Sequence, residues 1–310
     1  MTKAKVALVL GGGGARGLAH IGVLKVLEKN RIPIHLIVGT SMGAFVGGFY
    51  AAGTGIELME QIAVSVDRKF VAKMLAPSLS TFGIIDGERI RSYLEEFLGN
   101  LHIEELRIPF SSVSTDLTTG EEVIFSSGPL VDAIMTSIAI PALFKPVRYQ
   151  DRYLVDGGLV NPLPVSLAYR LGAEVSIAVK VTPVPSRVGR PKKGREPFRL
   201  NKTISMLRKR LLLQNQMLSE QKGGEEGSEY PSPPHLLQTL KQAIAVVETR
   251  LQDLQLDQQP PDVLISPTIN EFDLLSFHRA KGLIAAGEDA ATAVLSEIHT
   301  ALSGNSHSYR

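Results

Sequence analysis

The sequence contains no cysteine. This absence excludes disulfide bonds, thiolate metal sites and a cysteine nucleophile, and it is compatible with a reducing cytoplasm. The sequence also has no stretch close to the roughly 18 consecutive apolar residues that a membrane-spanning helix needs. Its first apolar run, Val6–Leu10, is followed by four glycines and is too short for the core of an export signal. We therefore expect a cytoplasmic protein whose first apolar run is a buried strand.

The chain has almost no excess of charge of either sign, with 33 basic and 31 acidic residues among 310. This balance gives no indication of a nucleic-acid partner, and no nucleic-acid-binding module is recognisable. The 21% of charged residues and 44% of AVILMFWYC residues are typical of a globular protein with a substantial core. The near neutrality conceals one basic segment, because residues 187–210 hold ten basic residues and one acidic residue.

Apolar runs alternate with helical patterns along the chain, which predicts an α/β fold of three layers. In such a fold, helices cover both faces of a mostly parallel central sheet. Gly172 is expected to end one helix, and Asp86 to cap the start of another. The expected strands are 6–10, 34–38, 110–115, 121–125, 153–155, 175–181 and 262–266, and the expected helices are 17–30, 42–52, 87–98, 130–137, 164–171 and 277–301.

The composition changes after Thr182. We expect residues 6–182 and 262–303 to form one core, and residues 183–261 to be an elaboration of it. Within the elaboration, apolar residues at helical spacing predict two amphipathic helices, at 200–218 and 237–254. A Gly-, Glu-, Ser- and Pro-rich stretch, residues 223–234, predicts a flexible loop.

The basic segment, which we take as residues 187–211 to include Leu211, has two interpretations. It is either a solvated loop or a surface that contacts an anionic membrane. Each Lys or Arg close to such a membrane contributes about 1 kcal/mol to binding. Leucine and isoleucine side chains at 200, 204, 207 and 211 would then enter the lipid interface. The sequence therefore predicts a peripheral membrane contact as the functional alternative.

The sequence GGGARG, residues 12–17, follows the first expected strand and opens a helix. Gly12, Gly14 and Gly17 give the pattern G-x-G-x-x-G, in which backbone N–H groups at a helix N-terminus bind an anion. A dinucleotide-binding loop also has an acidic residue about 20 positions later, which is missing here, and a P-loop needs lysine where Leu18 stands. We expect a transient anion at this loop.

The sequence GTSMG, residues 39–43, matches the G-x-S-x-G pattern of a nucleophile elbow between a strand and a helix. Gly39 and Gly43 would permit the sharp turn that presents Ser41. A serine nucleophile needs a base. Asp156 is a candidate because it ends an expected strand and is followed by Gly157 and Gly158. His278 or His299 could instead complete a Ser–Asp–His triad, although both lie in sequence that is predicted to be helical.

The three motifs GGGARG, GTSMG and DGG, in this order, resemble those of the patatin-like phospholipases. The stretches STDL (114–117) and SIAIP (137–141) are similar too, and PDVLI and SFHRA near the C-terminus look like bacterial members. The resemblance implies a serine lipid acyl hydrolase with a Ser–Asp dyad. It implies Ser41 as nucleophile and Asp156 as base, with the oxyanion hole at Gly12, Gly13, Gly14 and Arg16.

The expected substrate is a lipid or fatty-acyl ester, and the expected activity is that of a phospholipase, lysophospholipase or esterase. No cofactor and no metal are expected. A triad esterase and a non-catalytic lipid-binding regulator are the alternatives. No feature of the sequence predicts an oligomeric state.

Overall fold

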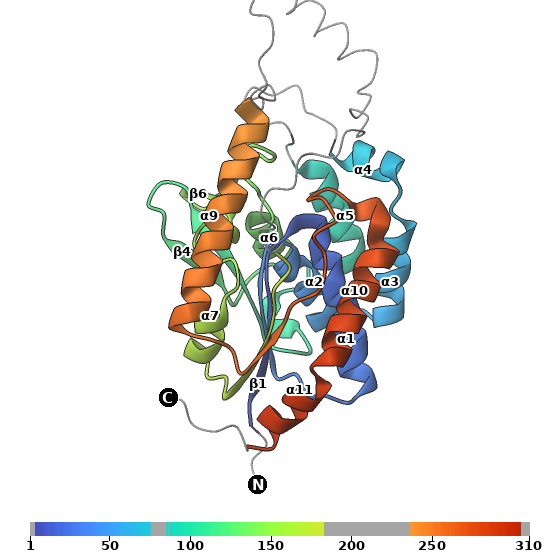
Figure 1. The fold of residues 1–310 in the computed structure, drawn as a ribbon. Helices are drawn as coiled ribbons and strands as arrows, with labels where there is room; N and C mark the ends of the chain where they lie inside the picture. Colours follow the sequence, from blue (N-terminus) through green and yellow to red (C-terminus); the bar gives the residue numbers. More distant parts are fainter. Residues whose placement is uncertain (1–3, 76–84, 86, 183–235, 305–310) are drawn as a thin grey trace, which may run out of the picture. The chain divides into compact units, whose positions relative to one another are not determined.

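A computed structural model describes residues 4–75, 85, 87–182 and 236–304 (Figure 1). In these residues an eight-stranded sheet has the order β5-β6-β3-β2-β1-β7-β8, with β4 also paired to β3. The strands β3, β2, β1, β7 and β8 are parallel, whereas β4, β5 and β6 pair antiparallel. The strands are β1 (Val6–Leu10), β2 (Leu36–Thr40), β3 (Phe110–Asp116), β4 (Glu122–Phe125), β5 (Val147–Tyr149), β6 (Arg152–Asp156), β7 (Val175–Val179) and β8 (Val263–Ile265).

Helices cover both faces of the sheet. Figure 1 shows α7 and α9 on one side, and α1, α2, α3 and α10 on the other. The helices are α1 (Ala19–Lys29), α2 (Met42–Ala51), α3 (Ile56–Ser65), α4 (Arg68–Met74), α5 (Glu88–Leu98), α6 (Leu130–Ser137), α7 (Val165–Arg170), α9 (Leu236–Gln258), α10 (Ala280–Ala293) and α11 (Leu295–Leu302), with 3-10 turns η1 (Gly14–Leu18), η2 (Ile103–Glu105), η3 (Gly157–Leu159) and η4 (Phe277–Arg279).

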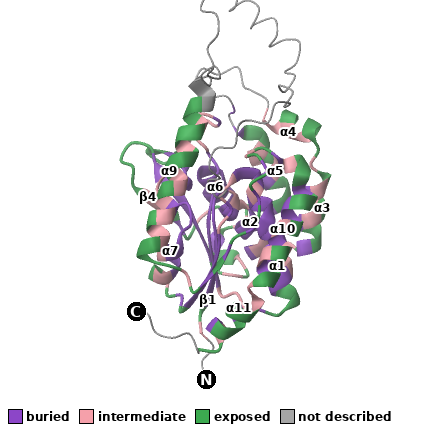
Figure 2. Cartoon of the chain, viewed as in Figure 1, coloured by how far each residue is buried: buried purple, intermediate pink, exposed green. Residues whose placement is uncertain are grey.

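The central strand β1 shows why the sequence specifies this arrangement. All five of its residues are buried (Figure 2). Leu8 and Leu10 face the layer that contains α1 and α10, whereas Ala7 and Val9 face the layer that contains α7. A strand buried on both faces has to be apolar throughout. The predicted three-layer α/β fold with a mostly parallel sheet is confirmed.

Helices α1 and α10 pack against each other and so bring the N-terminal and C-terminal parts of the chain into contact. A Cβ atom on Gly22 of α1 would lie 1.9 Å from the carbonyl oxygen of Ile284, and one on Gly287 of α10 would lie 2.0 Å from that of Ala19. The two backbones therefore touch, which only glycine permits at these positions. Strand β8 pairs in parallel with β7, so the C-terminal part completes the sheet and one of its covering layers.

Some boundaries differ from those expected from the sequence. The helix expected at 17–30 begins as the 3-10 turn η1, and the one expected at 277–301 is divided into η4, α10 and α11. Gly87 takes the N-cap of α5 with a φ of 84°, where Asp86 was expected, and Asp86 itself lies outside the described residues. Gly172 follows α7 with a φ of 85°, as expected.

Most of the expected elaboration lies outside the described residues, including the basic segment, the helix at 200–218 and the loop at 223–234. The second amphipathic helix is α9, and from residue 237 on it belongs to the same compact unit as the sheet. Over the part of the chain that the structure describes, no helix is long and apolar enough to cross a membrane.

Candidate active site

Ser41 lies in the turn between β2 and α2. Its φ of 55° and ψ of −124° are values that residues other than glycine rarely adopt. A Cβ atom on Gly43 would lie 2.0 Å from the carbonyl oxygen of Leu10, and one on Gly39 would lie 2.6 Å from the nitrogen of Ala44. The strand therefore changes to a helix within one residue, which is the geometry of a nucleophile elbow.

Ser41 and Asp156 are in direct contact. The Ser41 hydroxyl donates a hydrogen bond of 2.5 Å to Oδ2 of Asp156, and Oδ1 of Asp156 accepts one of 2.8 Å from the Gly158 N–H. Both side chains are buried. Burial raises the pKa of Asp156 to about 6, although the hydrogen bonds from Ser41 and Gly158 oppose this shift. At neutral pH the carboxylate is thus ionised and more basic than usual.

Buried hydroxyl groups hold this pair in place. Ser137, at the end of α6, accepts a hydrogen bond of 2.9 Å from the Ser41 N–H and donates one of 2.6 Å to the Val113 carbonyl. Thr115 on β3 donates a hydrogen bond of 2.8 Å to the Asp156 carbonyl. From the sequence, Ser137 and Thr115 were noted only because they stand in the stretches SIAIP and STDL that resemble the family. A feature that could have pointed to their role is that they are small polar residues within elements that are otherwise apolar and buried.

The glycine loop lies beside Ser41, since a Cβ atom on Gly12 would be 3.2 Å from Cβ of Ser41. The N–H of Gly12 donates to the carbonyl of Pro162 at 2.9 Å. The N–H groups of Gly13 and Gly14 have no hydrogen-bond partner among the residues that the structure describes. Two N–H groups next to Ser41 therefore remain available for an oxyanion.

Two side chains of the motif region anchor the glycine loop. Arg16 donates from Nε to the carbonyl of Phe272 at 2.8 Å. Burial lowers the pKa of Arg16, and the charges of Asp273 and Glu248 oppose that shift. His20 donates from Nε2 to the carbonyl of Gly11 at 2.9 Å. Its full burial lowers its pKa to about 4, so it is neutral at physiological pH.

The two histidines considered for a triad lie elsewhere. His278 is exposed in η4, where desolvation and the charges of Arg68 and Arg279 lower its pKa. His299 is in α11 and donates from Nδ1 to the carbonyl of Leu295 at 2.7 Å. Among the described residues that line the two cavities at Ser41, none is a histidine.

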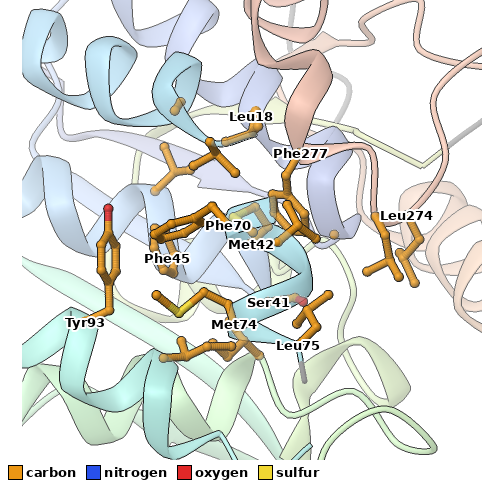
Figure 3. A pocket seen from close by; sticks show the side chains of 18 of the residues that line it. Leu18, Ser41, Met42, Phe45, Phe70, Met74, Leu75, Tyr93, Leu274 and Phe277 are labelled. Atoms are coloured by element: carbon orange, nitrogen blue, oxygen red, sulfur yellow. The ribbon is translucent and has the colours of Figure 1, made fainter. Parts of the chain in front are cut away.

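Two cavities meet at Ser41. The larger has a volume of about 190 Å³ and is lined almost entirely by apolar side chains, which come from η1, from α1 to α5 and from the segments 138–144 and 274–277. Figure 3 shows Ser41 near Leu75 and Leu274, with Tyr93 at the other side of this cavity. The smaller cavity has a volume of about 40 Å³ and lies between the glycine loop, Asp156 and α9. Gly14, Ser41, Ile140 and Leu274 line both cavities.

Helix α9 brings two charged side chains, Lys241 and Glu248, to the smaller cavity. Burial and the charge of Asp156 raise the pKa of Glu248 to about 8, and Arg16 opposes the shift. The sequence predicted the helix but no role for these residues. The sequence feature that could have pointed to them is their helical spacing, because Lys241 and Glu248 lie on the same face of the helix as Ile244. In the described part of the chain, no group of three or more His, Asp or Glu side chains could hold a metal ion.

A family model described as patatin-like phospholipase matches residues 8–169. The chain is also 33% identical, over 329 aligned positions, to an uncharacterised NTE family protein of Mycobacterium tuberculosis; the alignment covers 94% of this chain and 91% of that protein. The chain belongs to the patatin-like phospholipase family. Membership of this family supports the hydrolysis of lipid esters.

Further similarities cover smaller parts or are more distant. The chain is 33% identical over 187 residues to patatin-like phospholipase domain-containing protein 6 of Mus musculus, which covers 58% of this chain and 14% of that protein. The crystal structure of VipD from Legionella pneumophila is similar with a TM-score of 0.45 and 13% identity, over 96% of this chain and 67% of that chain.

Proposed function

We propose that this protein hydrolyses carboxylic esters of lipids through an acyl-enzyme intermediate, with Ser41 as nucleophile and Asp156 as base. The observation that carries the proposal is the hydrogen bond of 2.5 Å from the Ser41 hydroxyl to the Asp156 carboxylate. It lies in a strained elbow at the end of an apolar cavity. The substrate class includes phospholipids, lysophospholipids and simpler fatty-acyl esters.

The geometry supports the following sequence of steps. Asp156 accepts the hydroxyl proton as Ser41 Oγ attacks the ester carbonyl. The oxyanion forms against the free N–H groups of Gly13 and Gly14, and one such donor typically contributes about 3 kcal/mol. Gly12 supports this oxyanion hole through its bond to Pro162. Asp156 then protonates the leaving alcohol, and it later deprotonates the water that attacks the acyl-enzyme.

The larger cavity supports a fatty-acyl substrate. Its volume of about 190 Å³ exceeds the roughly 150 Å³ of an apolar cavity that binds benzene. Side chains such as Phe45, Phe70 and Met74 line it (Figure 3). An alkyl chain placed there would have its ester group at Ser41.

The positions of the histidines favour the dyad over the triad, because His278 and His299 do not line the cavities at Ser41. A non-catalytic lipid-binding regulator would have no need of the backbone strain at Ser41. Such strain costs about 1–3 kcal/mol and is typically retained where it serves function.

Steady-state hydrolysis of a short-chain ester and of a phospholipid tests the proposal. Ser41→Ala and Asp156→Asn should each remove nearly all activity on both substrates, while His278→Ala and His299→Ala stay active. Loss of activity in either histidine variant would replace the dyad by a triad. Residual hydrolysis of a few per cent in Ser41→Ala, free of contaminating enzyme, would contradict the role of Ser41.

We further propose that the protein makes a peripheral contact with anionic membranes. The basic segment that would provide it lies outside the described residues. The helix that follows it in the chain, α9, supports the idea through apolar side chains that are about half exposed: Leu240, Val246, Val247 and Leu254.

A further inference from the structure

The smaller cavity at Ser41 places a second carboxyl group close to the dyad. Glu248 of α9 and Asp156 both line this cavity. Oε1 of Glu248 lies 2.7 Å from the point where a Cβ atom on Gly158 would be, and Oδ1 of Asp156 lies 3.1 Å from that same point. Because residue 158 is glycine, no side chain of its own separates the two carboxyl groups. One small molecule in the cavity can therefore contact both of them.

The two carboxyl groups differ in their protonation. Burial and the charge of Asp156 raise the pKa of Glu248 to about 8, so that Glu248 is mainly neutral at neutral pH. Asp156, with a pKa of about 6, is mainly ionised under the same conditions. A carboxylate only accepts hydrogen bonds, whereas a neutral carboxyl group both donates and accepts them. Asp156 can thus take a proton from a molecule that Glu248 orients.

The size and place of the cavity indicate that this molecule is water. A volume of about 40 Å³ is room for up to about three water molecules, and the alcohol part of a lipid is too large for it. A buried water needs about two to four polar partners, and Asp156 and Glu248 supply two. Since Ser41 lines both cavities, an acyl group on Ser41 with its chain in the larger cavity would have its carbonyl carbon beside the smaller one.

We propose that Glu248 is a positioning residue for the second half of the reaction. It holds, in the cavity between α9 and the glycine loop, the water molecule that hydrolyses the acyl-enzyme. This inference rests on the proposed function, because it needs an acyl group on Ser41.

The step balances with the residues on the page. The carbonyl oxygen of Glu248 accepts one hydrogen of the water, and Asp156 accepts the other. As Asp156 takes its proton, the water oxygen bonds to the acyl carbon. The bond from that carbon to Ser41 Oγ then breaks, and Oγ takes the proton back from Asp156. The products are the free fatty acid and the original serine.

Competition between water and methanol for the acyl-enzyme tests this role. The protein is given a p-nitrophenyl ester of a fatty acid in buffer with methanol, and the methyl ester and the free acid are quantified by mass spectrometry. Both products come from the same acyl-enzyme, so their ratio does not depend on how fast that intermediate forms or on how much of the protein is folded. Methanol has a single hydroxyl hydrogen, which Asp156 takes, and therefore gains nothing from Glu248.

Glu248→Leu should raise the ratio of methyl ester to acid about tenfold, which is the effect of roughly one lost hydrogen bond. Glu248→Met, whose flexible side chain adapts to its surroundings, should do the same and serves if the leucine variant does not fold. Glu248→Gln keeps a carbonyl oxygen at this position and should stay within about twofold of the wild type. Asp257→Leu removes an exposed acid from the same helix and should leave the ratio unchanged.

The outcomes separate this inference from the proposed function. An active enzyme with the same product ratio in the wild type, Glu248→Leu and Glu248→Met overturns the role of Glu248 and leaves the function standing. A wild-type protein that forms neither the acid nor the methyl ester overturns the proposed function, and the inference with it.

Discussion

Asp156 is a buried carboxylate, and burying its charge lowers the free energy of unfolding. Its pKa is raised from 3.8 to about 6 by burial, so the folded chain holds the proton more tightly than the unfolded chain does. The stability of the fold therefore falls as the pH rises between these two values, and it stays lower above them. A shift of this size corresponds to about 3 kcal/mol at neutral pH.

Asp156→Asn should for this reason raise the free energy of unfolding at pH 7 to 8, by up to about 3 kcal/mol. The amide can still accept from Gly158 and can donate to Ser41. The gain should shrink below pH 6 and vanish near pH 4, as followed by urea denaturation at a series of pH values. Ser41→Ala keeps the buried carboxylate and should show no such gain. A difference between Asp156→Asn and wild type that does not vary with pH would contradict the account.

The pH profile of kcat/KM should have two inflections. The first, near 6, reports ionisation of Asp156, which must be a carboxylate to accept the Ser41 proton. The second, near 8, reports Glu248, whose negative charge would oppose the developing oxyanion. Among the described residues, the charges that act on Glu248 are those of Asp156 and Arg16, and Lys241 lines the same cavity.

Glu248→Gln should remove the inflection near pH 8 and retain the one near 6. The inflection near 6 does not by itself exclude a histidine, because burial has moved the carboxyl group into the range of an imidazole. It should persist in His278→Ala and His299→Ala. An unchanged alkaline limb in Glu248→Gln would contradict the role assigned to Glu248.

At the scale of single residues, the sequence alone was enough to single out the candidate residues that stand in short motifs. Ser41 and Asp156 each stand in a local pattern of strand, glycine and turn. Glu248 stands in no motif, because its place near Asp156 arises from where α9 lies against the core. Ser137 acts through one hydroxyl group on the backbone of Ser41, a contact that no spacing in the sequence encodes.

Among the elements, helices α1 and α10 cross with their backbones in contact at Gly22 and Gly287. Gly22→Ala should destabilise the protein by about 1–3 kcal/mol through overpacking, because the methyl group would meet the Ile284 carbonyl at 1.9 Å. This loss would outweigh the gain of up to about 1 kcal/mol in helix propensity. Gly55→Ala is the control. Its φ is −62°, and the nearest heavy atom to its Cβ would be 3.8 Å away.

Urea denaturation of both variants measures the difference. A loss in Gly55→Ala as large as that in Gly22→Ala, or no loss in Gly22→Ala, would show that the two helices do not depend on this contact.

The expected sheet and most expected helices were predictable because long, periodic apolar patterns specify them. Helix α3 was missed although its buried residues Ile56, Met59 and Ala63 lie at helical spacing. Two other unpredicted elements lack that signal. Helix α4 has no buried residue, and β5 is a strand of three residues at the edge of the sheet. The apolar pattern of α9 showed that one of its faces is buried, but not that this face lies against the dyad.

At the scale of the whole molecule, the basic segment predicts that the protein binds to membranes that contain anionic lipids. The chain should sediment with vesicles that contain an anionic lipid, and less so as salt is added, because electrostatic attraction is screened. Neutralising Arg208, Lys209 and Arg210 should weaken sedimentation while hydrolysis of a soluble short-chain ester is unchanged. Equal binding to neutral and anionic vesicles would remove the membrane contact from the account.

The central claim is that Ser41 is a nucleophile activated by Asp156, and covalent labelling tests it most directly. After reaction with a fluorophosphonate, peptide mass spectrometry should find the label on Ser41 in the wild type and in His278→Ala. Ser41→Ala should carry no label, and Asp156→Asn should label far more slowly. A label on another residue, or equal labelling rates in Asp156→Asn and wild type, would contradict the claim.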